Sequence, residues 1–135
     1  MIVNNCSVNY IPSGESHVSP YLIVKSGNDL IAFLQNVFNA KITLKHGDID
    51  GNPLHAQVKI KDSTVMIGTS QHDSLSINPS MLHVYVENVE ETMEKALQHG
   101  AELTLEIKLD EDAGDKRGMF KDPTGNYWAI ATHIS

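Results

Sequence analysis

Two five-residue segments of this chain have nearly the same sequence. They read Ala-Lys-Ile-Thr-Leu at residues 40–44 and Ala-Glu-Leu-Thr-Leu at residues 101–105, so they begin 61 positions apart. Each segment follows a stretch whose apolar residues recur at helical spacing. The chain is therefore predicted to contain two copies of one structural unit.

The same order of elements surrounds both segments. Alternating apolar residues predict one strand before each helix and two further strands after each repeat segment. With the repeat segment itself as a strand, each half reads β-α-β-β-β. Asn88 and Glu91 stand at capping-box positions, and Gly100 is placed to end the second helix. The predicted strands cover residues 20–24, 54–60 and 64–68 in the first half and 82–86, 119–121 and 127–132 in the second; the predicted buried helix faces are Leu30, Phe33, Leu34, Val37 and Phe38, then Val89, Met93, Ala96 and Leu97.

A unit of about 60 residues is near the lower limit for burying its own core, so the two units are expected to pack as one domain. We therefore divide the chain into an N-terminal extension, residues 1–17, and a single domain, residues 18–135. The domain consists of a first module, residues 18–69, a linker, residues 70–80, and a second module, residues 81–135. The extension is interpreted as an arm or an added edge strand, with disorder as the competing interpretation, and composition does not decide between them.

Composition excludes several classes of function. The formal net charge of -7 argues against a nucleic-acid or anionic-membrane partner, because both require a basic surface. The sequence has no apolar run long enough to cross a membrane. Residues 1–9 lack the features of a signal peptide, and the single cysteine, Cys6, excludes an internal disulfide. These features predict a soluble protein of the cytoplasm.

Several segments, taken in order, resemble one known superfamily. They are residues 20–24, 32–40, 55–63, 114–115 and 121–133, the strongest being Lys-Asp-Pro-Thr-Gly-Asn-Tyr-Trp at residues 121–128. The superfamily is that of the glyoxalase, bleomycin-resistance and extradiol-dioxygenase proteins, also called vicinal oxygen chelate proteins, and the likeness is greatest to its PhnB-like group. The resemblance implies an α+β fold in which two repeated β-α-β-β-β modules form a curled, mostly antiparallel sheet trough with helices outside. It also implies a homodimer.

Strand parity then sorts residues by face, since successive side chains of a strand point to opposite sides. One set is predicted to pack under the helices and the other to line the trough. A mixture of hydroxyl, imidazole and amide groups suits a small organic ligand with polar handles, although tyrosine on a sheet face is also common in ordinary cores. The predicted ligand-binding residues are Tyr21, His55, Gln57, His83, Tyr85 and Tyr127.

Metal-dependent members of the superfamily take ligands from three strands, and the resemblance maps these positions onto Ser19, His83 and Ala129. Only His83 is a metal ligand of the usual kind. No metal and no other cofactor is therefore predicted, although a relocated site built from His55, His83 and His133 stays open as an alternative.

Two functions remain open. The first is binding of a small molecule without chemistry, and the second is an isomerase, lyase or dioxygenase-type reaction that uses a relocated metal or His83 as the acid and base. The segment at residues 114–118 resembles the superfamily's Gly-Asp-Arg segment but has Lys116 where Arg is usual. It is interpreted as a turn with surface charge, and its neighbours as a solvated edge and loop: Glu102, Glu106, Asp110, Glu111, Asp112 and Asp115.

Overall fold

The computed structural model describes residues 10–70, 77 and 79–134. The remaining residues, including most of the predicted extension and linker, lie outside the described part of the chain. The first module contains β1 (Tyr21–Val24), α1 (Gly27–Phe38), β2 (Lys41–His46), β3 (His55–Ile60) and β4 (Ser63–Thr69); the second contains β5 (Met81–Tyr85), α2 (Val89–Gln98), β6 (Glu102–Asp110), β7 (Asp115–Lys121) and β8 (Tyr127–His133).

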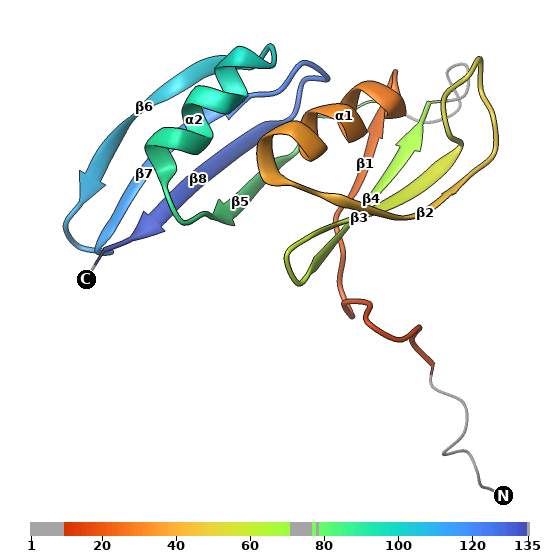
Figure 1. Ribbon diagram of the computed structural model, residues 1–135, viewed down its shortest axis with the longest axis horizontal. Helices are drawn as coiled ribbons and strands as arrows, with labels where there is room; N and C mark the ends of the chain where they lie inside the picture. The colour runs from red at the N-terminus through yellow and green to blue at the C-terminus, as the bar shows by residue number, and fades with distance from the viewer. Residues whose placement is uncertain (1–9, 71–76, 78, 135) are drawn as a thin grey trace, which may run out of the picture.

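The predicted duplication is confirmed. The strands form two four-stranded sheets with equivalent orders, β1-β4-β3-β2 and β5-β8-β7-β6. In each sheet the first and last strands of the module pair in parallel, and the other neighbours are antiparallel. Figure 1 shows the sheets side by side, with β2 and β6 at the two outer ends and a helix lying across each sheet. The α+β class predicted from the sequence is therefore correct.

Side-chain caps mark where both helices begin. The Oδ1 atom of Asn88 accepts a hydrogen bond from the backbone N–H of Glu91 at 3.0 Å, as the sequence predicts. Ser26 serves α1 in the same way, accepting from the N–H of Asp29 at 3.2 Å. Gly100 follows α2 with a φ of +98°, a conformation that favours glycine. None of the described helices is both long and apolar enough to cross a lipid bilayer.

The two repeat segments form the edge strands β2 and β6. In both strands the pairing register shifts at the same place, between Ile42 and Leu44 in β2 and between Leu103 and Leu105 in β6. A bulge twists an edge strand and makes it a poorer template for pairing with another chain. The sequence repeat therefore encodes an irregular, protected edge in each module.

A cluster of aromatic side chains joins the two modules. Phe33 and Phe38 of α1 lie against Phe120 of β7, with ring centroids 5.7 Å and 6.3 Å away, and Phe38 lies 5.2 Å from Trp128 of β8. Phe120 and Trp128 are fully buried. The helix of the first module thus supplies part of the core of the second, as the prediction of a single shared core requires.

The turn before β8 is tied to this core. Trp128 donates its indole N–H to Asp122 Oδ2 at 2.7 Å, and Asp122 Oδ1 accepts from the backbone N–H groups of Thr124 and Asn126 at 2.7 Å and 3.2 Å. Asp122 is buried, so its carboxylate depends on these donors. The motif at residues 121–128 is therefore a structural device that fixes a turn to a buried tryptophan.

Two predictions about apolar faces are wrong. Leu97 of α2 is 41% exposed and Leu54, just before β3, is 37% exposed. Leu97 is the next-to-last residue of its helix, and Leu54 precedes its strand by one residue, so neither lies under the opposing layer. The other predicted helix-face residues are buried, as are Ala56, Val58, Ile60, Trp128 and Ile130.

We predict that Phe120→Ala lowers the free energy of unfolding by about 3–5 kcal/mol, because it removes a buried ring and leaves a cavity. Urea denaturation followed by far-UV circular dichroism measures this loss, and the exposed Leu109→Ala in the neighbouring strand is the matched control. Because both modules contact Phe120, the variant is expected to unfold in one transition. Two separate transitions would contradict the shared core.

Candidate functional site

Each sheet has one face that packs under the helices and one that turns away from them. On the helix-packed side lie buried residues such as Leu22, Val24 and Val58. The opposite sides, which we call the module 1 face and the module 2 face, hold the alternate residues of the same strands. Strand register places all the predicted ligand-binding residues there: Tyr21, His55 and Gln57 on the module 1 face, and His83, Tyr85 and Tyr127 on the module 2 face.

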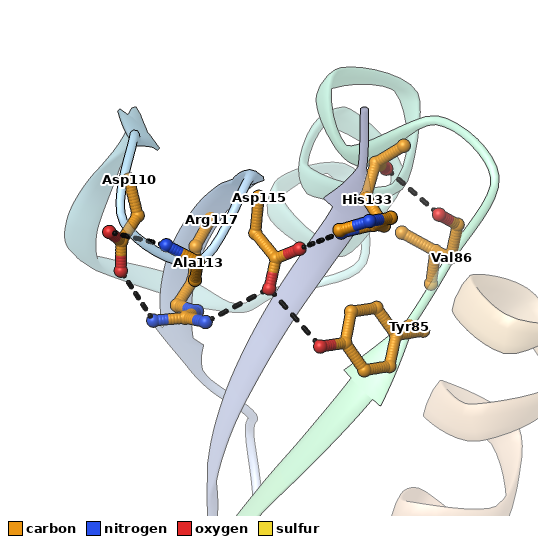
Figure 2. A network of polar contacts seen from close by, with 8 residues as sticks. Tyr85, Val86, Asp110, Ala113, Asp115, Arg117 and His133 are labelled. Carbon is orange, nitrogen blue, oxygen red and sulfur yellow. Dashed lines mark hydrogen bonds and ion pairs between the residues drawn. The ribbon is translucent and has the colours of Figure 1, made fainter. Parts of the chain in front are cut away.

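The module 2 face contains a network of polar contacts centred on Asp115 (Figure 2). The carboxylate of Asp115 accepts hydrogen bonds from Tyr85 Oη at 3.1 Å, Arg117 Nη2 at 3.1 Å and His133 Nδ1 at 2.8 Å. Arg117 also reaches Asp110 Oδ2 through Nη1 at 3.4 Å. Asp115 is only 1% exposed, whereas the side chain of His133 is 55% exposed. A buried carboxylate thus holds side chains that reach the surface.

The turn between β6 and β7 explains why Asp115 lies here. Asp110 Oδ1 accepts from the N–H of Ala113 at 3.2 Å, and the carbonyl of Asp110 accepts from the N–H of Gly114 at 2.8 Å. Gly114 has a φ of +75°, and its carbonyl accepts from the N–H of Ile134 at 2.9 Å. The turn therefore docks on the end of β8 and places Asp115 directly opposite His133 in the sheet register.

Charge and hydrogen bonding shift the pKa values of two groups of this network, Asp115 and Tyr85. The hydrogen bond from His133 lowers the pKa of Asp115 from its ordinary value of 3.8, and the bonds from Tyr85 and Arg117 act in the same direction against the effect of burial. The hydrogen bond to Asp115 raises the pKa of Tyr85 above its ordinary value. The network consequently keeps an ionised carboxylate beside a neutral phenol.

His83 lies next to this network without joining it by a hydrogen bond. Its ring stands edge-on to that of Tyr85, with centroids 4.8 Å apart, and it faces Ala129 across the strand pair. Two open grooves border these side chains. The larger, about 870 Å³, is lined by Tyr85 and His133 together with the ends of both helices, and the smaller, about 430 Å³, is lined by His83 and Tyr85.

A second polar cluster lies on the module 1 face. His55 Nδ1 is 2.8 Å from the hydroxyl oxygen of Tyr21, and His55 Nε2 is 3.2 Å from Gln57 Nε2. The ring of His46 lies 5.4 Å from that of His55, its direct partner across β2 and β3. Burial and, second, the neighbouring His46 lower the pKa of His55. Among the described residues, no hydrogen bond connects this cluster with the Asp115 network.

The structure therefore brings together some predicted site residues and separates others. Tyr21, His55 and Gln57 form the cluster on the module 1 face. His83 and Tyr85 contact each other on the module 2 face. Tyr127 lies apart from both, with the Lys121 ammonium 6.0 Å from its ring centroid. The role of the six predicted residues in binding a ligand stays a prediction.

The interpretation of Asp115 as part of a solvated turn is wrong. It begins β7 and is buried, because three side chains satisfy its carboxylate. The sequence predicts this strand only from Met119 onward, whereas β7 begins at Asp115, and strand alternation places Asp115, Arg117 and Met119 on one face. The sequence points to His133 only as a ligand of a relocated metal site, and it does not point to His46, which lies two residues beyond the repeat segment.

Comparisons with known proteins agree with the observed fold. A family model described as the Glyoxalase/Bleomycin resistance protein/Dioxygenase superfamily matches residues 16–130. Uncharacterized proteins of Mycobacterium bovis and Mycobacterium tuberculosis are 28% identical over 130 residues, covering 89% of this chain and 85% and 76% of theirs.

Solved structures show the same architecture. TioX from Micromonospora sp. ML1 has a TM-score of 0.71 at 21% identity, covering 88% of this chain and 99% of its own. The fosfomycin resistance protein FosX from Listeria monocytogenes, in a complex with Mn(II) and sulfate, has a TM-score of 0.65 at 20% identity, covering 93% of this chain and 92% of its own.

The superfamily's metal does not fit the positions that the resemblance assigns to it. Ala129 has no ligand atom, and the hydroxyl of Ser19 is buried with no hydrogen-bond partner among the described residues. His83 alone does not hold a divalent ion. Within residues 10–70, 77 and 79–134, no three His, Cys, Asp or Glu side chains gather as a metal group, so His55, His83 and His133 do not form the alternative site either.

We predict that Asp115→Asn makes the protein less sensitive to acid. Because folding lowers the pKa of Asp115, its ionisation stabilises the fold above the unfolded value of 3.8, and this contribution is lost as the pH falls through the folded pKa. The stability difference between wild type and variant should therefore shrink as the pH is lowered from 6 toward 2. Urea midpoints at several pH values test this, with the exposed Asp112→Asn as control. A difference that does not change with pH would contradict the network.

Proposed function

Because this chain belongs to the Glyoxalase/Bleomycin resistance protein/Dioxygenase superfamily, we propose that it binds a small organic ligand on the sheet faces that turn away from the helices. It does so without the superfamily's usual metal triad, since the three inherited positions offer one ligand. The order of its sequence segments favours the PhnB-like group within the superfamily. Its single cysteine favours action in the reducing cytoplasm.

The observation that supports this proposal most is the Asp115 network. A fold gains little from burying a carboxylate, because the cost of removing it from water offsets much of the gain from its partners. Here the buried carboxylate holds Tyr85 and His133 at the rim of the larger groove. Such an arrangement presents a hydroxyl and an imidazole in fixed positions beside apolar side chains, which suits a ligand with polar handles.

A homodimer would complete the site. The two polar clusters face away from the helices on separate sheets, and large apolar side chains are exposed around them. On the module 1 face these are Tyr21 and Leu44, and on the module 2 face Met81, Tyr85 and Leu105. We propose that the module 1 face of one copy covers the module 2 face of another, so that the ligand lies between two chains.

One observation favours a second candidate function, proton transfer to or from the ligand. Asp115 accepts from Nδ1 of His133, which leaves the Nε2 lone pair of the neutral imidazole free to act as a base. The structure orients His133 in this way and gives His83 no such partner among the described residues. Under this second function the wild type converts the ligand and His133→Gln abolishes the turnover, whereas under binding alone the wild type releases the ligand unchanged.

The binding proposal predicts a bound compound that depends on the module 2 face. Protein purified without an affinity tag is denatured, and the released molecules are identified by mass spectrometry. We expect one compound in near-stoichiometric amount from wild type and at least ten times less from Tyr85→Ala, because that change removes the ring at both grooves. The exposed Tyr10→Ala is the control. Equal amounts from both variants, or no small molecule that binds the wild type in a thermal-shift screen, would contradict the proposal.

A further inference from the structure

The module 1 face carries a set of metal-ligand side chains at positions different from the inherited ones. His46 and His55 are direct cross-strand partners on β2 and β3, and Gln57 lies two residues beyond His55 on the same face. These residues come from neighbouring strands of one sheet, so the backbone hydrogen bonds fix their spacing. Imidazole nitrogen is a preferred ligand of Zn²⁺, Ni²⁺ and Cu²⁺.

The distance between the two rings matches a shared ion. Two imidazoles bound to one tetrahedral ion, with metal–nitrogen distances of about 2.0–2.1 Å, have ring centres about 5 Å apart. The rings of His46 and His55 are 5.4 Å apart and inclined at 48°. The separation of the two rings is therefore compatible with a shared ion.

The contacts of His55 indicate which of its nitrogens carries the lone pair. Gln57 Nε2 lies 3.2 Å from His55 Nε2, and an amide nitrogen can only donate, so His55 Nε2 is the acceptor. The proton of the neutral ring is then on Nδ1, which donates to the hydroxyl oxygen of Tyr21 at 2.8 Å. Histidines that bind metals typically donate their other ring N–H in this way, which orients the ring and raises its basicity.

The side chain of Gln57 can supply a third ligand. Rotating the Gln57 carboxamide by half a turn replaces its N–H group by Oε1, a neutral oxygen ligand next to the same nitrogen. The set then supplies two nitrogens and one oxygen and leaves coordination positions open toward the face where we propose that the ligand binds.

We propose that His46, His55 and Gln57 form a binding site for a divalent first-row transition-metal ion of the Zn²⁺ class, with Tyr21 as the residue that orients His55. This site lies on β2 and β3, away from the positions at Ser19, His83 and Ala129. It goes beyond the proposed binding function and does not depend on it, because an ion can bind whether or not an organic ligand is present.

Isothermal titration of the full-length, tag-free protein with ZnCl₂ and NiCl₂ after chelator treatment tests the site. We expect one ion per chain, at least a tenfold loss of affinity in His46→Ala and in His55→Ala, and a loss on the order of tenfold in Tyr21→Phe, the effect expected of an orienting partner. The control is His99→Ala, at the end of α2, which should bind as the wild type does.

Nuclear magnetic resonance of the wild type provides a test that needs no variant. Added Zn²⁺ should shift the imidazole signals of His46 and His55 together and leave those of His99 unchanged. The proposal is overturned if wild type binds neither ion more tightly than the His46→Ala/His55→Ala double variant. It is equally overturned if the signals that shift are those of His83 or His133 alone. Release of an organic compound in the earlier experiment has no bearing on either outcome.

Discussion

The packing of α1 against the second module is the contact on which the rest of the arrangement depends. Phe33 and Phe38 of α1 pack against Phe120 of β7 and Trp128 of β8, so the helix of the first module shares a core with the sheet of the second. Burial of this apolar surface is the main source of stability. It also determines which faces remain free, and those free faces carry the polar clusters.

The duplicated modules have the same framework and different chemistry. Gly68 of β4 and Ala129 of β8 are equivalent positions, 61 residues apart like the repeat segments, and each lies opposite the first strand of its module. Gly68 leaves room for Tyr21, since a Cβ there would approach that ring to 3.0 Å. Ala129 lies opposite His83 without a ligand atom. The first module therefore collects histidines and an amide, whereas the second builds a buried carboxylate network.

The sequence predicts the framework because repetition and alternation are local signals. The segments at residues 40–44 and 101–105 locate β2 and β6, and alternation assigns His83 and Tyr85 to one face and Val84 to the other. The Asp115 network was not predictable in the same way. It depends on a turn that joins β6, β7 and β8, and local composition at residues 110–115 indicates only a charged loop. His46 was missed because cross-strand pairing with His55 depends on the bulge at Thr43.

We propose that the module 1 face of one chain meets the module 2 face of another around the ligand, and site-directed cross-linking tests this proposal most directly. Two variants in a Cys6→Ser background, Leu44→Cys and Met81→Cys, each place one thiol on one of these faces, at apolar positions outside both polar clusters. The two proteins are mixed and treated with a short bismaleimide. The account predicts a covalent pair containing one chain of each kind, formed faster than any pair from Tyr10→Cys. Monomers at all protein concentrations, or cross-linking no faster than that of Tyr10→Cys, would contradict it.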